Sequence, residues 1–403
     1  MKLTVAMKII GGFTIISVLL LLTSIISWNS LNTIGEATKQ QDELAIPTLK
    51  ESNILANELT SIGNLTLRAY YQTTLPPLTT NQNTFDSETI NFKKHLKKLK
   101  EIVQNEPRLI NNLVKIDPIY NKLDKEIKSV LSNRKYAIEQ HITLTEKINT
   151  IEESADDTAT ILLDLGDHEL ATTKLQRAVS LAERLEMLLN SIVSSSFEYR
   201  EVKDKQSESL VSSEIENTFK DIEKSVYDVV SELELQGTSG IASDLTDSFS
   251  TLKSYLTGNG RVFINKNNQL KSISAATVSL QLAEDGIKSA NAILAKQVEL
   301  ANETTIATSN LIDKSVANGI RNTSIITFIS IILAFIIASV TLRSITRPLM
   351  RVNEMLNVVA SGDLSRKLDE SGKDEFAQLS HNCNLLIESL RTLIQSIVSR
   401  STQ

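Results

Sequence analysis

Two long apolar runs interrupt a chain that is otherwise amphipathic. Ile9–Trp28 and Thr323–Leu342 each hold 20 consecutive residues without a charged side chain, and a helix of 20 residues is about 30 Å long, like the hydrocarbon core of a bilayer. The first run exceeds the apolar region of roughly 7 to 15 residues in cleaved signal peptides. It ends at Trp28, an aromatic residue typical of the membrane interface. The pattern predicts two transmembrane helices, at 9–28 and 323–342.

Basic residues precede the first predicted span and follow the second. Lys2 and Lys8 precede the first span, and Arg343, Arg347 and Arg351 follow the second. Cytoplasmic flanks of membrane helices carry an excess of Lys and Arg. We therefore expect a cytoplasmic N-terminus at 1–8, an extracytoplasmic domain at 30–322, and a cytoplasmic segment from residue 343 onward.

The segment between the spans is periodic and poor in chain breakers. The whole sequence holds 13 Gly and 6 Pro among 403 residues, which favours long helices. Phe85, Phe92, Leu96, Leu99 and Val103 follow one face of a 3.6-residue period. The breakers predict helical segments at 30–74, 85–104, 107–165, 168–235, 241–257 and 261–342, with a kink at Pro47. The expected fold class is all-α, an elongated antiparallel helical bundle.

Two weak echoes suggest an internal duplication. The LANEL run at Leu55–Leu59 resembles LAERL at Leu181–Leu185, an offset of 126 residues. Phe92–Val103 resembles Phe219–Val230 at an offset of 127 residues. If the echoes reflect the fold, they predict two stacked four-helix modules that share their longest helices.

Composition and charge exclude several kinds of function. The net charge is −6, and the acidic excess falls between the spans, which gives no support to nucleic-acid binding. One Cys allows no intramolecular disulfide, and four scattered His residues suggest neither a metal site nor a catalytic triad. No glycine-rich nucleotide motif occurs. We expect no enzymatic activity, no cofactor and no metal.

The segment after the second span carries the sharpest pattern, two apolar heptad runs separated by a polar connector of about 13 residues. A single helix cannot bury such a seam, so two chains are expected to form a parallel four-helix coiled coil. The expected core positions are Leu349, Val352, Leu356, Val359, Phe376, Leu379, Cys383, Leu386, Leu390 and Leu393. In the connector, Leu364 and Leu368 should lie in the groove between the helices, and Gly362 should allow a tight exit from the first helix.

Residues 343–396 resemble the HAMP linker of bacterial transmembrane receptors. The entry Thr346–Leu349, the turn Gly362–Leu364 and the helix start Asp374–Phe376 stand where that module has them, and Ala377 stands where many members carry Gly. The resemblance implies signalling roles for Pro348, Gly362, Leu364, Leu368, Asp374 and Glu375. The segment looks most like methyl-accepting chemotaxis receptors, and residues 30–322 resemble their helical bimodular sensor domain. Residues 397–403 would then begin an output helix.

This resemblance implies a homodimeric chemoreceptor in the bacterial inner (plasma) membrane, in contact with lipid and with both termini cytoplasmic. It would sense a small solute, an organic acid or another metabolite, and pass the signal through the second span to the HAMP module. Two alternatives stay open. The chain could be the sensor portion of a histidine kinase that uses a periplasmic binding protein, or a helical membrane scaffold that does not switch. After Gln403, long helices with Glu and Gln methylation sites would indicate a chemoreceptor, and a phospho-acceptor His would indicate a kinase. We expect the given chain to be either a fragment or a truncated receptor.

A carboxylate solute would need Arg donors and hydroxyl groups to bind it. Arg68 and Arg200 are the leading candidates, since each stands beside aromatic residues in the sequence. The full set of candidate ligand-binding residues is Arg68, Tyr70, Thr73, Arg184, Tyr199, Arg200 and Arg261. Organic-acid-sensing relatives tend to carry an Arg early in the first external helix, and no Arg precedes Arg68 there, which argues against an organic acid.

Overall fold

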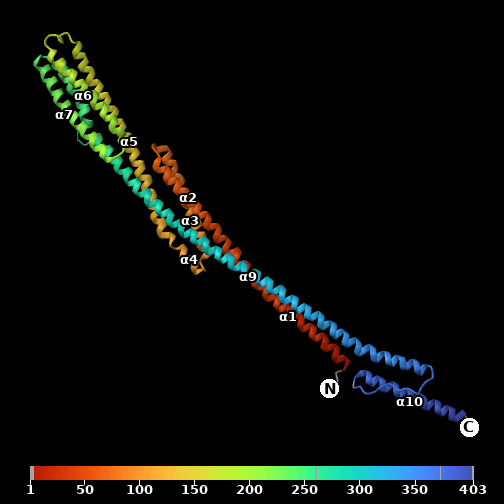
Figure 1. Ribbon diagram of the computed structural model, residues 1–403. Coiled ribbons are helices and arrows are strands. Elements are labelled where there is room, and N and C mark those ends of the chain that lie inside the picture. Colours follow the sequence, from red (N-terminus) through yellow and green to blue (C-terminus); the bar gives the residue numbers. More distant parts are fainter. Residues whose placement is uncertain (1–3, 259–260, 373, 402–403) are drawn as a thin grey trace. The chain divides into compact units, whose positions relative to one another are not determined.

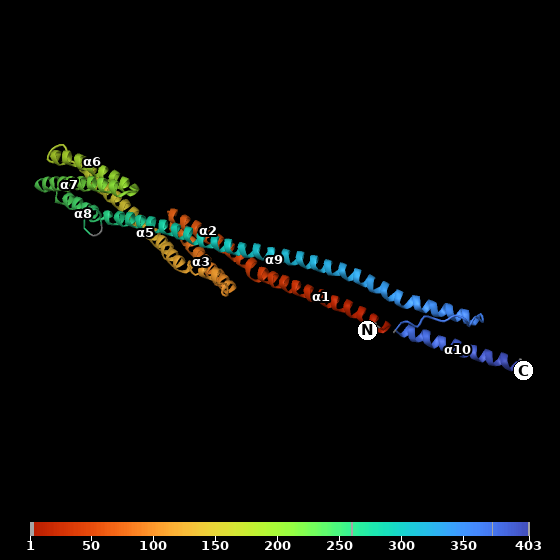
Figure 2. The same cartoon turned by 60° about the horizontal axis from the view of Figure 1, so that its bottom comes forward.

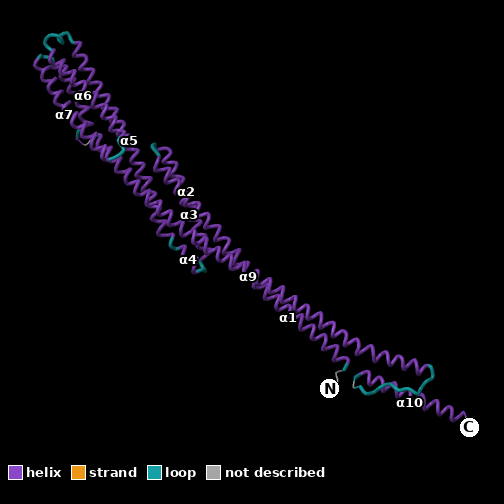
Figure 3. Tube along the Cα trace, viewed as in Figure 1, coloured by secondary structure: helices purple, strands orange, loops and turns teal. Residues whose placement is uncertain are grey.

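The computed structural model describes residues 4–258, 261–372 and 374–401, and these ranges contain helices and no strand (Figure 1, Figure 2 and Figure 3). The elements are α1 (Val5–Gln40), the π-helical turn η1 (Gln41–Ala45), α2 (Ile46–Tyr71), α3 (Leu75–Val103), α4 (Pro107–Leu113), α5 (Ile116–Asp167), α6 (Gln176–Glu201), α7 (Lys205–Leu235), α8 (Ser239–Leu256), α9 (Val262–Ala360) and α10 (Glu375–Ser401). The all-α fold class is confirmed.

The chain forms two compact parts. The sensor part comprises Ile46–Asn302, and the membrane part comprises the described residues of 1–45 and 303–403. Helix α9 belongs to both, because it begins in the sensor part and continues without interruption to Ala360.

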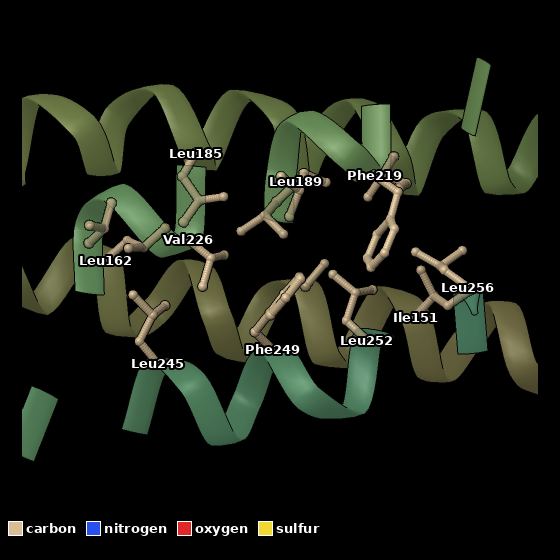
Figure 4. Close-up of a cluster of buried hydrophobic side chains, with 14 of the residues drawn as sticks. Ile151, Leu162, Leu185, Leu189, Phe219, Val226, Leu245, Phe249, Leu252 and Leu256 are labelled. Atoms are coloured by element: carbon tan, nitrogen blue, oxygen red, sulfur yellow. The ribbon is translucent and has the colours of Figure 1, made fainter. Parts of the chain in front are cut away.

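One end of the sensor part is a four-helix bundle of α6, α7, α8 and the second half of α5 (Figure 1). All four helices contribute side chains to its apolar core (Figure 4), in which the rings of Phe219 and Phe249 stack with centroids 5.8 Å apart. Leu185, Leu189 and Ile192 show why α6 packs here, since their spacing puts them on one face of a helix. We call this end the α6–α8 bundle.

The other end combines α2 and α3 with the first half of α5 and the first part of α9 (Figure 2). Phe92 of α3 stacks on Tyr120 of α5 with ring centroids 4.3 Å apart. Gly63 of α2 lets α9 approach closely, because a Cβ added there would lie 3.0 Å from Ile287 Cδ1. Helix α5 therefore takes part in both bundles, whereas α8 packs in the α6–α8 bundle and α9 packs on α2 and α5.

The hairpins α2–α3 and α6–α7 are structurally equivalent. Their first helices are both 26 residues long. The helix ends and starts keep a constant offset of 130 residues, from Tyr71 to Glu201 (201 − 71) and from Leu75 to Lys205 (205 − 75). The buried positions repeat at the same offset, as in the pairs Leu55–Leu185, Leu59–Leu189, Ile62–Ile192, Phe92–Ile222, Leu99–Val229 and Val103–Leu233. The internal repeat expected from sequence therefore corresponds to a pair of hairpins with matching lengths and buried positions, and the duplication itself stays a prediction. Its sequence-based register of 126 to 127 residues was wrong by about one helical turn.

Some predicted helix boundaries were wrong, each for a local reason. Helix α3 starts at Leu75 rather than near residue 85, because Pro is tolerated in the first turn of a helix. The predicted helix at 168–235 is two helices, α6 and α7, separated by residues 202–204. Neither Gly nor Pro marks that break. It is set by Asp204, whose carboxylate accepts the N–H of Ser207 at 2.8 Å and so caps α7.

In the membrane part, both apolar runs are helical and expose their side chains. Helices α1 and α9 are long and apolar enough to cross a bilayer, and only 6% and 0% of their most apolar windows are buried. A core helix of a soluble protein would bury that surface, so the chain is a membrane protein. Its orientation stays a prediction. The π-helical turn η1 ends at Ala45, two residues before Pro47, where the sequence predicts a kink.

Candidate functional site

A pocket of about 190 Å³ lies in the sensor part where the α2–α3 connection meets α5 and α9. One water molecule occupies roughly 30 Å³ in the liquid, so the pocket has room for a small solute. It is lined by Thr73 of the connection, Arg134, Ala137, Ile138 and His141 of α5, and Gln269 and Ile273 of α9. We call it the α5–α9 pocket.

Arg134 is the cation of this pocket, and the α2–α3 hairpin holds it in place. Its Nη2 donates to the backbone carbonyl of Gln72 at 2.6 Å, and its guanidinium lies over the ring of Tyr70, 5.4 Å from the centroid. Burial lowers the pKa of Arg134 from its usual value, but a guanidinium remains charged at neutral pH. Its Nε is buried and has no hydrogen-bond partner among the described residues.

Two further buried atoms of the pocket, Nδ1 of His141 and Oε1 of Gln269, also have no partner in the described part of the chain. Burial is the main cause that lowers the pKa of His141, and the charge of Lys266 adds to it. Both causes favour the neutral ring, whose Nδ1 can donate or accept according to the tautomer, whereas Gln269 Oε1 can only accept. An orphaned buried polar atom costs about 1–3 kcal/mol, and most such atoms in proteins are satisfied. Three of them in one pocket make it a candidate binding site.

A second cation lies near the pocket. Lys266 of α9 is 1% exposed, and its Nζ donates to the backbone carbonyl of Arg200 at 2.7 Å. Burial lowers the pKa of Lys266 to about 8. Lys266 and Arg134 make equivalent contacts. Arg134 of α5 binds a carbonyl at the C-terminal end of α2, and Lys266 of α9 binds a carbonyl at the C-terminal end of α6. Cations are favoured at the C-terminal ends of helices. The junction of the two bundles therefore holds both of these cations, and the carboxylates of Glu201 and Glu208 interact with one of them, Lys266.

Two of the residues proposed from sequence lie at the pocket. Thr73 lines it. Tyr70 lies under the guanidinium of Arg134, and its hydroxyl shares a 2.8 Å hydrogen bond with Thr277 of α9. Arg68, two residues before Tyr70 in α2, is exposed and does not line the pocket.

The other proposed residues lie elsewhere in the sensor part. Tyr199 is buried in the α6–α8 bundle. Arg200 pairs with Glu201 at 2.9 Å. Arg184 is exposed on α6, and Arg261 is exposed before α9. None of the four lines the α5–α9 pocket, and their part in ligand binding stays a prediction.

Sequence reasoning missed Arg134, His141 and Gln269. It favoured Arg residues with aromatic neighbours in sequence, whereas the aromatic partner of Arg134 is Tyr70, on another helix. The chain shows no motif that joins residues more than 120 positions apart, so only the packing of α5 against α9 brings these three together.

The connector of the HAMP-like segment begins with the turn that the sequence predicts. Gly362 has φ of 92°, its N–H donates to the carbonyl of Val359, and the N–H of Asp363 donates to that of Val358. This pattern satisfies the last carbonyls of α9. A side chain at Gly362 would be strained in the left-handed region.

The connector and its two helices bring together several residues that the resemblance singles out. Pro348, Leu368 and Asp374 line a common cavity of about 190 Å³. Asp374 caps α10 by accepting the N–H of Ala377 at 3.1 Å. Glu375 accepts the N–H of Val5 at 2.8 Å, and this hydrogen bond is the main cause that lowers its pKa. Leu364 is half-buried.

Half of the ten predicted coiled-coil core positions are exposed in the single chain. Leu349, Leu386 and Leu393 are 53%, 51% and 57% exposed, although Val352 is buried. The face that α10 buries within the chain is a different one, made by Ser380, Asn384 and Ile387. The heptad face therefore remains available to a second chain.

Comparisons with known proteins agree with this part of the molecule. The family model described as "HAMP domain" matches residues 340–392, so the chain carries a HAMP signal-transduction domain after its second candidate span. No curated protein matches the chain. Among solved structures, the chain is similar to one titled "Crystal Structure of the TorS sensor domain - TorT complex in the presence of TMAO". The two share 14% identity with a TM-score of 0.34, over 63% of this chain and 99% of that one.

Proposed function

We propose that this protein is a transmembrane chemoreceptor that senses a small extracytoplasmic solute. The observation that carries the proposal is the continuity of α9. This single helix holds Gln269 and Ile273 of the α5–α9 pocket, then the second candidate span, and then the first helix of the HAMP domain. A change in the packing of α9 within the sensor part is therefore applied to the helix that enters the HAMP domain.

The mechanism needs two packings of the sensor part that differ in their affinity for the solute. Binding then shifts the population toward the packing that binds better. A small displacement of α9 is sufficient, because packed helical interfaces switch between discrete arrangements rather than deforming continuously. The HAMP domain is the bistable element that reads the displacement.

The receptor acts as a homodimer and not as an enzyme. The open heptad positions of α9 and α10, such as Leu349 and Leu386, support a second chain at the HAMP domain. The polar groups of the α5–α9 pocket support binding rather than catalysis, because they include no nucleophile paired with a base. No cofactor is invoked.

The alternatives differ in what lies beyond the sensor. A histidine kinase would use the same spans and HAMP domain, with either a solute or a periplasmic binding protein acting on the sensor part. A scaffold would have the same helices but would give no response to any solute. All three readings place the sensor part outside the cytoplasm and the HAMP domain inside.

Two chimeras separate these readings. The first chimera joins Ile397, in heptad register, to the cytoplasmic half of a chemotaxis receptor. The second chimera joins Ile397 to the catalytic half of a histidine kinase. Each is expressed in cells that lack its native counterpart and is challenged with fractionated metabolite mixtures. The proposal expects solute-dependent control by the first chimera. A response from the kinase chimera alone favours the kinase, and silence from both favours the scaffold.

A further inference from the structure

We propose that the α5–α9 pocket binds a short solute that carries a carboxylate and an adjacent hydrogen-bond donor, the chemistry of an α-hydroxy or α-amino acid. The inference rests on the proposed function, since it names the solute class of that sensor. Its basis is the set of orphaned atoms in the pocket, Arg134 Nε, His141 Nδ1 and Gln269 Oε1.

The carboxylate is selected by charge and by one free donor, both supplied by Arg134 of α5, so the lack of an Arg early in the first external helix does not exclude a carboxylic acid here. Arg134 already uses Nη2 to hold the carbonyl of Gln72, so its geometry is fixed before a ligand arrives. Its buried Nε–H then remains to donate to an anionic oxygen, a charge-assisted bond that is stronger than a neutral one. Lys266, close enough to His141 to lower its pKa, adds positive potential, which the nearby Glu201 partly offsets.

The hydrogen-bond donor is selected by Gln269. Its Oε1 is buried, has no partner among the residues that the structure describes, and can only accept. A simple anion such as acetate would satisfy Arg134 and leave this oxygen orphaned, because an ionised carboxylate has no donor. A simple amine would satisfy the oxygen but meet the charge of Arg134. A hydroxyl or ammonium group next to the carboxylate satisfies both, and His141 can bond to either group.

The location of the pocket connects binding with signalling. Arg134 and His141 belong to α5, Gln269 and Ile273 belong to α9, and Thr73 belongs to the α2–α3 connection. A solute bonded to Arg134 and Gln269 joins α5 to α9 at the junction of the two bundles. The pocket is small, about 190 Å³, which fits a solute of few non-hydrogen atoms and excludes long chains.

The test uses the full chain in lipid nanodiscs and four probes of similar size at neutral pH: glycolate, glycine, acetate and ethanolamine. Binding is measured by titration calorimetry and by the rise in unfolding temperature, because a ligand that binds the folded state stabilises it. We expect glycolate or glycine to bind at least about tenfold more tightly than acetate or ethanolamine, a difference of about 1.4 kcal/mol. Equal affinity for acetate, or no binding of any probe because water fills the pocket, overturns the proposal.

Two variants and one matched control assign the binding to the pocket. Arg134→Gln should abolish binding, and Gln269→Met should remove the preference for glycolate or glycine over acetate. Lys135→Gln removes the same charge from the adjacent residue, whose side chain is 60% exposed, and should leave binding unchanged. If Arg134→Gln does not fold, Gln269→Met decides alone. An unchanged preference in Gln269→Met overturns the proposal.

The outcome is separable from that of the proposed function. If no probe binds while the chemotaxis chimera responds to another solute, the pocket assignment is wrong and the receptor function holds. If glycolate binds through Arg134 and Gln269 while both chimeras stay silent, the site is right and the receptor function is wrong.

Discussion

The side-chain amide of Asn384 in α10 pairs with the backbone of Leu368 in both directions. Its Oδ1 accepts the Leu368 N–H at 2.8 Å, and its Nδ2 donates to the Leu368 carbonyl at 2.8 Å. Asn384 is 7% exposed and also donates to Glu370 Oε1 at 2.5 Å. Because an amide matches a peptide group in donors and acceptors, this one residue fixes the HAMP connector to α10 independently of the Leu368 side chain.

Asn384→Ala should loosen the connector. The variant leaves the N–H and carbonyl of Leu368 without their partners, at a cost of about 1–3 kcal/mol in the stability of the HAMP domain. Hydrogen exchange over the connector should be faster than in the unaltered chain. Asn382→Ala, an exposed neighbour on α10, is the control and should exchange like the unaltered chain. Equal protection in Asn384→Ala would show that the pairing does not stabilise the connector.

Asn384 also shows what the sequence could and could not predict. The heptads located α10 and the connector, because apolar periodicity is a local signal. The hydrogen bonds from Asn384 to the connector are not local in sequence and belong to no motif, so the sequence did not predict them. The same contrast holds in the sensor part, where Pro and Gly marked most helix ends but the break capped by Asp204 was missed.

The candidate site was less predictable than the fold for the same reason. Sequence reasoning found Thr73 and Tyr70 because they sit near the end of a predicted helix. It missed Arg134, since an isolated Arg in an amphipathic helix is most often a surface residue. Its burial depends on the carbonyl of Gln72, which becomes its partner only when α2 packs against α5.

Tyr199→Phe should destabilise the α6–α8 bundle. The Tyr199 hydroxyl donates to Glu208 Oε1 at 2.7 Å, and both residues are buried. Without the hydroxyl, the Glu208 carboxylate keeps its hydrogen bond from Lys205 at 2.6 Å but loses the one to Oε1. We therefore expect a loss of about 1–3 kcal/mol in the free energy of unfolding. Denaturant titration measures it.

The matched control is Tyr227→Phe on α7, where the side chain is 72% exposed and the change should stay within about 0.5 kcal/mol. If Tyr199→Phe kept full stability but lost solute binding, the sequence-based interpretation of Tyr199 as a ligand contact would be right instead.

The stability of the sensor part should rise with pH above about 8 because of Lys266. Burial lowers its pKa from 10.5 to about 8 in the folded chain. Below pH 8 both states hold the proton, and the cost of burying the charge is constant. Between pH 8 and 10.5 the unfolded chain still binds a proton that the folded chain has released, so the free energy of unfolding increases, by up to about 3 kcal/mol.

Chemical denaturation of the full chain at several pH values tests this dependence. In Lys266→Met the free energy of unfolding should no longer increase between pH 8 and 10.5, whether or not the variant is more stable at any one pH. Lys271→Met, an exposed Lys on the same helix, should keep the rise. A rise that survives in Lys266→Met would assign the pH dependence to other groups.

Cys383 should crosslink two chains in the membrane through the open heptad face of α10. It lies between the heptad positions Leu379 and Leu386, which are 37% and 51% exposed in the single chain, and a parallel coiled coil brings equivalent seam residues face to face. Mild oxidation should therefore give a dimer band that Cys383→Ser removes.

Leu386→Glu puts two charges into the seam and should reduce the yield of the crosslinked dimer several-fold. The matched control is Leu385→Glu, because Leu385 is 54% exposed but lies outside the heptad. Equal loss of crosslinking in both Glu variants would mean that another face of α10 meets the second chain.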